Sequence, residues 1–283
     1  MQFSVTAEWL NEQIRLKKTV TILDCRFDLK KPDAGEAEYL QSHIPGAVYI
    51  HLNRDLSGKV KNHGGRHPLP EMDRFRDKMQ QAGVNDDELI IVYDGGEGAF
   101  AARAWWLLTF AGHKQTFLLD GGYSEWREKG YPLSETIPDV QRGTFKLDLQ
   151  LESIAETAEV EQIVDGYTRG TLIDSRESAR YRGDHEPIDK VAGHIPGALN
   201  YEWFESYQAG NLLKPDDQKK RFSDLDPDQP LIVYCGSGVT ACPNIIALKM
   251  AGFKHVKLYT GSYSDWISYT DHEIETGETN KKE

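Results

Sequence analysis

The chain has 283 residues, which is long enough for about two domains that each bury a hydrophobic core. Hydrophobic residues make up 39% of it and aromatic residues 10%, and these fractions exclude an intrinsically disordered chain. The formal net charge of −12 disfavours nucleic acid and anionic membrane surfaces as partners, so an anionic substrate needs a local cationic site.

No targeting or membrane-spanning signal is visible in the sequence. The first 13 residues lack a basic stretch followed by an apolar core, so they do not resemble a secretory signal peptide. The longest apolar stretch, residues 99–112, contains Arg103 and is too short to span a bilayer. Three cysteines without Cys-x-x-Cys spacing favour neither a disulfide framework nor a zinc site. We therefore expect a reducing, cytoplasmic environment, with no metal and no other cofactor.

The chain repeats itself after 140–151 residues. Four motifs recur in the same order in both halves: an apolar run ending in Asp-x-Arg, a His-Ile-Pro-Gly-Ala motif, a β-branched run and a Tyr-Ser-x-Trp ending. The matched segments are 21–26 with 171–176, 43–47 with 194–198, 89–93 with 230–234, and 121–126 with 261–266. This order indicates that one ancestral domain was duplicated.

Within each half, short β-branched runs are followed by longer helical stretches. Residues 89–93 precede a predicted helix over 99–111, and residues 231–234 precede one over 239–251. Short strands that alternate with helices predict parallel pairing through crossover helices. The predicted fold class is α/β, with two tandem domains that each have a central, mostly parallel sheet flanked by helices.

The domain boundary is predicted near residue 150. Residues 135–150 include Pro138 and Gly143 and show no strong periodicity, which is typical of a linker. The predicted domains are therefore residues 1–134 and residues 151–283.

Two glycine-containing loops, at 94–98 and 235–240, follow a predicted strand and lead into a predicted helix. At such a place backbone N–H groups and the positive end of the helix face an anion. The thiolate of Cys235 should therefore be stabilised, and Cys235 is the candidate nucleophile. The first half has Asp94 at the equivalent place, and a carboxylate cannot act as a soft sulfur nucleophile. The first half is therefore predicted to be catalytically inactive.

Other repeated or reactive residue types are interpreted as structural. Cys25 and Cys242 have no glycine loop of their own and are expected to be buried thiols. His43 and His194 recur in both halves, including the half without a nucleophile, so a turn-stabilising role is favoured over catalysis.

These motifs, together with Cys-Gly-Ser-Gly-Val-Thr at 235–240, resemble the tandem-domain sulfurtransferases of the rhodanese family. The resemblance covers roughly residues 5–268. In that family a cysteine of the C-terminal domain takes a sulfane sulfur from a donor, becomes a persulfide and passes the sulfur to an acceptor such as cyanide or a thiol. The resemblance implies that Cys235 is this cysteine and that the acceptor is a thiol, such as a small thiol or thioredoxin.

The residues after the cysteine indicate the donor. Family members specialised for thiosulfate resemble Cys-Arg-Lys-Gly-Val-Thr, whereas members that use 3-mercaptopyruvate resemble the sequence found here. A dianion benefits from two cations in the loop, whereas a monocarboxylate thiol needs fewer charges and more hydrogen bonds near its leaving enolate. The resemblance therefore favours 3-mercaptopyruvate, with thiosulfate as the alternative donor.

The resemblance also implies which residues bind the donor. The family's arginine four residues after Asp-x-Arg corresponds to Arg180, the candidate clamp for a donor carboxylate; the alternative is a surface ion pair with Glu177 or Asp184. A second family arginine, after a Glu-Pro element, is absent, and Lys190 is the candidate point charge in its place. The other substrate-binding candidates are Arg176, which is also expected to pair with Asp174, and the loop residues Gly236, Gly238, Val239 and Thr240.

A proton-handling group is implied as well. Ser237 matches the family's loop serine, and His67 in His-Pro-Leu-Pro matches its histidine, with Asp55 as the nearest upstream aspartate. The alternative for His67 is a hydrogen-bonded interface histidine. A metal site at His63 and His67 is disfavoured, because Gly-Gly-Arg between them opposes a helix and a third ligand is not apparent.

Two further functions are weighed against sulfur transfer. The rhodanese fold resembles that of certain cysteine-dependent phosphatases, whose loop has an arginine six residues after the nucleophile. Ala241 occupies that position here, which disfavours phosphatase activity. A non-enzymatic, rhodanese-like sulfur-binding scaffold is opposed by the intact loop at Cys235, although the first half alone would fit it.

Overall fold

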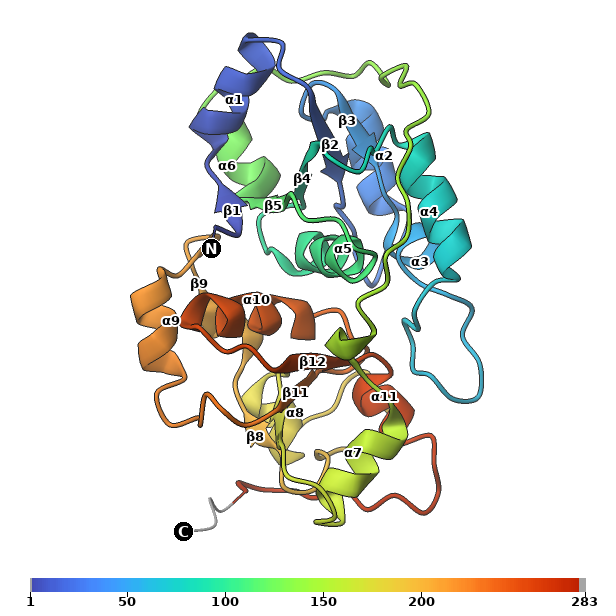
Figure 1. Cartoon of the computed structure of the whole chain (residues 1–283), viewed down its shortest axis with the longest axis vertical. Coiled ribbons are helices and arrows are strands. Elements are labelled where there is room, and N and C mark those ends of the chain that lie inside the picture. Colours follow the sequence, from blue (N-terminus) through green and yellow to red (C-terminus); the bar gives the residue numbers. More distant parts are fainter. Residues whose placement is uncertain (1, 280–283) are drawn as a thin grey trace. The chain divides into compact units, whose positions relative to one another are not determined.

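The computed structural model describes residues 2–279, which fold into two compact units (Figure 1). The first unit contains the chain up to Gly58, then Leu69–Gln150 and Tyr207–Leu212. The second contains Lys59–Pro68, Leu151–Ser206 and the chain from Leu213 onward. Each unit therefore includes a short segment from the other half of the sequence.

These compact units differ from the predicted domain boundaries in two places. Residues 135–150 belong to the first unit rather than forming a linker: Phe145 is buried, and its backbone N–H donates to Val84 O at 3.2 Å. The segments 59–68 and 207–212 each belong to the unit opposite to the one predicted. The sequence carries no signal for these assignments, because irregular and very short extended segments lack hydrophobic periodicity.

The first unit is built on a five-stranded sheet in which every pair of neighbours is parallel, in the order β1-β5-β4-β2-β3. Its strands are β1 Ser4–Val5, β2 Val20–Asp24, β3 Ala47–Tyr49, β4 Leu89–Tyr93 and β5 Thr116–Leu119. Its helices are α1 Ala7–Arg15, α2 Ala34–Gln41, α3 Leu52–Asp55, α4 Met72–Gln81, α5 Ala99–Phe110 and α6 Gly122–Glu128. The short hairpin of β9 Tyr207–Gln208 and β10 Asn211–Leu212 also belongs to this unit.

Both faces of the first sheet are covered, which explains the continuous apolar run of β4. Ile91 and Tyr93 lie in a core cluster with Leu10 of α1 and Trp126 of α6. Ile90 points to the opposite face by strand alternation, where α5 contacts β4 and β5. Figure 1 shows α1 and α6 next to each other. A strand buried on both faces has no polar face, so it reads as a hydrophobic run.

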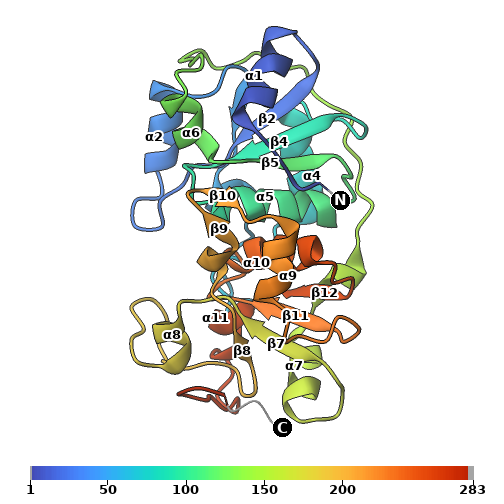
Figure 2. The ribbon, with the colours of Figure 1, turned by 90° about the vertical axis from the view of Figure 1, so that its left-hand side faces the viewer.

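The second unit repeats this arrangement, with the parallel order β6-β12-β11-β7-β8 (Figure 2). Its strands are β6 Ile154–Ala155, β7 Thr171–Asp174, β8 Leu199–Asn200, β11 Leu231–Tyr234 and β12 Val256–Tyr259. Its helices are α7 Thr157–Val164, α8 Ser178–Arg182, α9 Pro215–Arg221, α10 Ala241–Ala251 and α11 Ser262–Trp266, with 3-10 turns η1 Leu151–Ser153 and η2 Trp203–Ser206. The predicted α/β fold with two tandem, mostly parallel domains is confirmed.

The repeated Asp-x-Arg motif forms a buried ion pair in both units. In the second unit Arg176 Nη2 donates to Asp174 Oδ2 at 2.6 Å, and its guanidinium lies 3.9 Å from the centre of the Tyr263 ring. In the first unit Arg26 pairs with Asp24 at 2.7 Å in the same way. Both arginines therefore connect the end of a strand to neighbouring loops, which is the structural role predicted for Arg176.

The repeated histidines also have structural partners. His43 stacks on Tyr39, with ring centres 4.1 Å apart, and its Nδ1 lies 2.7 Å from Tyr39 O. His194 stacks on Tyr181 at 3.8 Å, and its Nδ1 lies 2.8 Å from Tyr181 O. Both imidazoles are fully buried. These contacts support the interpretation that both histidines stabilise turns.

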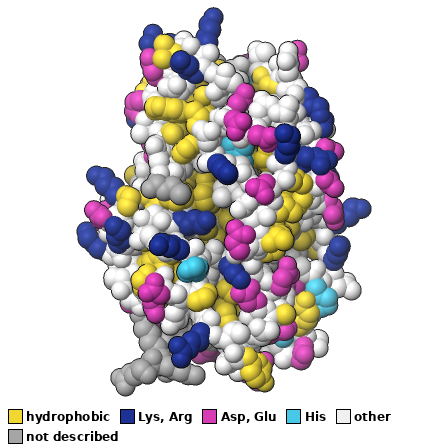
Figure 3. Space-filling view, viewed as in Figure 1, with side chains coloured by type: hydrophobic (Ala, Val, Ile, Leu, Met, Phe, Trp, Pro, Cys, Tyr) yellow, Lys and Arg dark blue, Asp and Glu magenta, His cyan; other side chains and the backbone are white. Residues whose placement is uncertain are grey.

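The surface shows mixed charge. On the face drawn in Figure 3, basic and acidic side chains are interspersed and no continuous basic patch is visible. Among the helices of residues 2–279, none has the length and hydropathy of a membrane-spanning segment.

Candidate active site

Cys235 follows β11 directly and lies in the loop that leads into α10. Its side chain is buried, and Sγ accepts a hydrogen bond from the backbone N–H of Gly238 at 3.2 Å. Gly238 has a φ of +78°, a conformation that side chains with a Cβ resist. The loop thus turns back on the sulfur and presents it to an N–H group just before the N-terminus of α10. Val239 and Thr240, both predicted to bind substrate, complete the turn, and α10 begins after them at Ala241.

Hydrogen bonds from the start of α11 hold the Cys235 loop in place. The backbone N–H of Tyr263 donates to Cys235 O at 2.9 Å, and that of Ser264 donates to Gly236 O at 3.0 Å. The Ser262 hydroxyl accepts from the Cys235 N–H at 3.2 Å and donates to Tyr259 O at 2.9 Å. Ser262 has a φ of +56°, which is unusual for a residue other than glycine. In the sequence, this backbone conformation is indicated by the repeat, since the first half has Gly122 at the position equivalent to Ser262.

Residues 59–68 bring two further side chains to this loop. The N–H of Gly64 donates to Asp265 Oδ1 at 2.6 Å, and the N–H of Arg66 donates to Ser264 Oγ at 3.1 Å. Gly65 has a φ of +77°, and a Cβ there would lie 2.2 Å from Gly261 O. The segment therefore packs closely on the start of α11, and the next residue after Arg66 is His67.

The predicted pair of His67 and Ser237 is brought together, with His67 Nδ1 and Ser237 Oγ 2.8 Å apart. Asp55 lies in the first unit, where Oδ2 accepts the backbone N–H of His51 at 2.8 Å and lies 3.3 Å from Lys78 Nζ. This carboxylate caps the start of α3. These contacts of Asp55 lie within the first unit, and its predicted part in proton transfer beside His67 stays a prediction.

Arg180 of α8 lies in a group of buried charges. Its Nε and Nη2 donate to the Glu186 carboxylate at 2.8–3.1 Å, and Nη2 also donates to Asp189 Oδ2 at 2.9 Å. Arg66 Nη1 pairs with Asp189 Oδ1. Burial lowers the pKa of the Arg66 guanidinium, although nearby Cys235 opposes that shift. The alternative expectation is a surface ion pair of Arg180 with Glu177 or Asp184. Among the described residues, its guanidinium pairs with neither of them.

This charged group lies against the residue that follows Cys235. A Cβ at Gly236 would be 2.8 Å from Arg66 Nη2 and 3.5 Å from Arg180 Nη2. The loop itself carries no formal charge, as the sequence indicates, but two guanidinium groups from other segments lie beside it, both paired with Asp189. Lys190, the predicted second cation, is exposed, and Arg66 is the cation missed by sequence reasoning.

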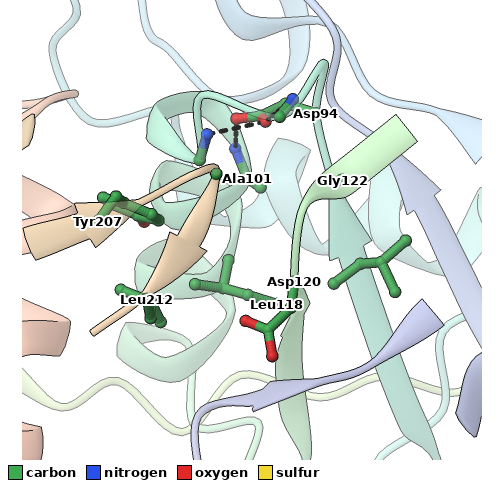
Figure 4. Close-up of a pocket in the computed structure, with 11 residues that line it drawn as sticks. Asp94, Ala101, Leu118, Asp120, Gly122, Tyr207 and Leu212 are labelled. Atoms are coloured by element: carbon green, nitrogen blue, oxygen red, sulfur yellow. Dashed lines mark hydrogen bonds between the residues drawn. The ribbon is translucent and has the colours of Figure 1, made fainter. Parts of the chain in front are cut away.

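The equivalent loop of the first unit is filled by its own side chain (Figure 4). The Asp94 carboxylate accepts hydrogen bonds of 2.9–3.1 Å from four backbone N–H groups. Burial raises the pKa of Asp94, and these four donors oppose the shift. The donors belong to Gly96, Gly98, Phe100 and Ala101. The adjoining cavity, of about 10 Å³, has room for at most about one water molecule.

Asp120 lines the same cavity and gives a pH-dependent prediction (Figure 4). Burial raises its pKa to about 6, the Ser4 hydroxyl opposes this shift, and Glu125 adds to it. Between about pH 4 and pH 6 the unfolded state therefore ionises first, and folding stability falls as pH rises. We expect Asp120→Asn to remove this fall and to raise the free energy of unfolding at neutral pH by about 1–2 kcal/mol.

Urea unfolding across this pH range measures the effect. The exposed Asp139→Asn is the control, for which no change in the pH profile is expected. Parallel profiles for Asp120→Asn and the parent protein would contradict the prediction.

A metal site is not formed by the described residues. Among residues 2–279, no group of three or more His, Cys, Asp or Glu side chains is arranged to hold an ion. His63 instead stacks on Tyr269 at 4.2 Å, and its Nδ1 lies 2.7 Å from Ser268 Oγ.

Known proteins resemble the chain along nearly its whole length. The model of the rhodanese-like domain matches residues 6–129 and 156–269. A probable 3-mercaptopyruvate sulfurtransferase of Pseudomonas aeruginosa is 41% identical, covering 91% of this chain and 92% of the relative. A putative thiosulfate sulfurtransferase of Mycobacterium tuberculosis is 37% identical, with 94% of each chain covered.

Comparison with solved structures points to the same group of sulfurtransferases. A crystal structure of a 3-mercaptopyruvate sulfotransferase from Escherichia coli superimposes with a TM-score of 0.82 at 34% identity, covering 93% of this chain and all of that one. The match of the domain model to both halves agrees with the internal repeat and with the twin sheets. The chain therefore belongs to the rhodanese family, with one rhodanese-like domain in each half.

Proposed function

We propose that the protein is a sulfurtransferase that moves a sulfane sulfur from 3-mercaptopyruvate to a thiol or cyanide through a persulfide on Cys235. One observation carries the proposal: the Cys235 sulfur faces the Gly238 N–H before a helix N-terminus, while Arg66 and Arg180 lie against Gly236. The site thus combines a nucleophilic sulfur with groups that attract a small anion. The names of the P. aeruginosa and E. coli relatives support this donor.

In the first step the Cys235 thiolate attacks the thiol sulfur of the donor. A sulfur–sulfur bond forms, the carbon–sulfur bond breaks, and its electron pair leaves as the enolate of pyruvate. Cys235 then carries the persulfide, and protonation of the enolate carbon yields pyruvate. The N–H of Gly238 is placed to stabilise negative charge on the cysteine sulfur.

Ser237 and His67 are suited to supply the proton. The hydroxyl and the imidazole are within hydrogen-bond distance, and Ser237 is two residues from the nucleophile. An imidazole titrates near neutral pH and can pass a proton through the hydroxyl to the enolate. This proton transfer needs only the hydroxyl and the imidazole, while Asp55 contacts the His51 N–H and Lys78.

In the second step an acceptor takes the outer sulfur. An acceptor thiolate attacks it, forms a new persulfide on the acceptor and releases the Cys235 thiolate. Cyanide reacts in the same way and leaves as thiocyanate. Small thiols and thioredoxin are the proposed physiological acceptors. A reducing cytoplasm suits this chemistry, because Cys235 must stay reduced between cycles.

Thiosulfate is the competing donor. The M. tuberculosis relative is named for it, and two guanidinium groups beside Gly236 also suit a dianion. Side-by-side steady-state kinetics with the two donors separates the alternatives. The proposal expects the larger kcat/KM for 3-mercaptopyruvate.

Intact-mass measurement tests the chemistry directly. After incubation with 3-mercaptopyruvate and removal of the donor, we expect the protein to gain one sulfur atom and pyruvate to appear in equal amount. Addition of cyanide should remove the sulfur. A sulfur gained only from thiosulfate would reassign the donor, and no gain from either donor would favour the non-enzymatic scaffold.

A further inference from the structure

Asp189 lies between the two guanidinium groups nearest to the catalytic loop. One carboxylate oxygen pairs with Arg66, and the other accepts from Arg180 Nη2 at 2.9 Å. The Asp189 side chain is only 2% exposed. A Cβ at Gly236 would lie 3.4 Å from Asp189 Oδ2, so this carboxylate faces the residue next to Cys235.

The charges of this cluster are balanced without a ligand. Three guanidinium groups face three carboxylates, and most of these side chains are almost fully buried. A donor carboxylate that entered would add a fourth negative charge, which is unfavourable in a buried group unless another carboxylate leaves. The cluster consists of Arg66, Arg176 and Arg180 with Asp174, Glu186 and Asp189.

Of the two carboxylates bound to Arg180, Glu186 is held more firmly. It accepts from Arg180, from Arg176 Nη1 and from the backbone N–H groups of Ile188 and Asp189. The Asp189 carboxylate contacts the guanidinium groups of Arg66 and Arg180. Asp189 also lies in the segment 187–191, which forms bends rather than a helix or strand, and in which the other four residues are exposed. Turning Asp189 outward therefore breaks few contacts.

We infer that Asp189 is an internal carboxylate that occupies the donor's carboxylate subsite, and that Arg66 is the second guanidinium of this subsite beside Arg180. On binding, the donor's carboxylate replaces that of Asp189 on the two arginines, and the segment 187–191 turns Asp189 toward solvent. The inference rests on the proposed function and specifies its donor class as small carboxylates. In this arrangement Arg66 takes the place of the second carboxylate-binding arginine that the family has after the element matching Glu186-Pro187.

Steady-state kinetics of Asp189→Asn tests the competition. We expect KM for 3-mercaptopyruvate to fall by at least about threefold, since apparent affinity follows the fraction of molecules with an open subsite. The kcat should stay within about twofold, because Asp189 does not touch the reacting sulfur in the bound state. The matched control is Asp184→Asn, which removes the same charge from an exposed carboxylate paired with Arg182. Asp189→Ala should give the same fall in KM as Asp189→Asn.

Arg66→Gln tests the other half of the inference. Losing one charge-assisted contact should raise KM about tenfold or more, the opposite of the effect of Asp189→Asn. Pyruvate, which has the donor's carboxylate but no sulfur to transfer, is the second probe. Its inhibition constant should fall in Asp189→Asn and rise in Arg66→Gln, with either 3-mercaptopyruvate or thiosulfate as the donor.

The two proposals fail in different ways. If the parent protein used only thiosulfate while pyruvate inhibition still followed these two variants, the donor would be wrong and the subsite would stand. If Asp189→Asn and Asp189→Ala left KM and pyruvate inhibition unchanged, or weakened both, Asp189 would organise the arginines rather than compete with the donor. That result would overturn the inference.

Discussion

Cys235→Ser should abolish the gain of sulfur from 3-mercaptopyruvate and reduce turnover by at least about a thousandfold, because a serine hydroxyl cannot carry a persulfide. The variant should fold normally, since serine is close in size to cysteine and the loop is held by the backbone bonds to Tyr263 and Ser264. Intact mass, turnover and the melting temperature measure these effects.

The other two cysteines are the controls. Cys25 is buried, and burial raises the pKa of its thiol, with the carboxylates of Asp24, Asp94 and Asp55 adding to the shift. Cys242 is buried in α10, and its Sγ lies 3.4 Å from Gly238 O. Cys25→Ser and Cys242→Ser should therefore keep most of the activity. Normal turnover by Cys235→Ser, or inactivity of Cys242→Ser alone, would show that the nucleophile is assigned wrongly.

Arg180→Ala should lower kcat/KM for 3-mercaptopyruvate by about 10- to 100-fold, which corresponds to one lost hydrogen bond between charged groups. Arg180 is mostly buried and donates to two carboxylates, so we also expect a lower melting temperature. Arg180→Lys should recover only part of the activity, because lysine keeps the charge but loses the forked geometry of the guanidinium.

The matched control for this change is Arg182→Ala. Arg182 lies on the same helix, α8, but is a third exposed and pairs with the exposed Asp184 and Glu278. The Arg182→Ala substitution should leave kcat/KM for 3-mercaptopyruvate unchanged. If Arg180→Ala lowered the melting temperature and kept the parental kcat/KM, Arg180 would be a structural residue and the carboxylate site would lie elsewhere.

Much of the fold could be predicted because its determinants are local and repeated. The apolar runs of β4 and β11 are buried on both faces, so their positions stand out in the sequence. The loop at Cys235 could also be found, since its glycines lie between a strand and a helix. The pairing of Ser237 with His67 came from the resemblance to the rhodanese family, because the two residues are 170 positions apart.

Other parts of the site depend on contacts that leave no local signal. Arg66 and Asp189 are 123 residues apart, and both lie outside regular secondary structure. The absence of charge between Cys235 and Thr240 suggested a site with few cations, but Arg66 and Arg180 reach Gly236 from other segments. Residues 135–150 lacked periodicity because their backbone bonds go to turns of the first unit, such as Val84, rather than to each other.

Asp94 has a consequence for the geometry of the persulfide itself. A carboxylate oxygen of aspartate and the outer sulfur of a cysteine persulfide are each two bonds from Cβ, and each carries negative charge. The loop of the first unit is therefore a permanent analogue of the sulfur-loaded loop in the second. Its donors lie two, four, six and seven residues after Asp94. One of these donors has a counterpart in the second loop: Gly98 and Gly238 share a left-handed backbone, with φ of +81° and +78°, and the Gly238 N–H already donates to the Cys235 sulfur.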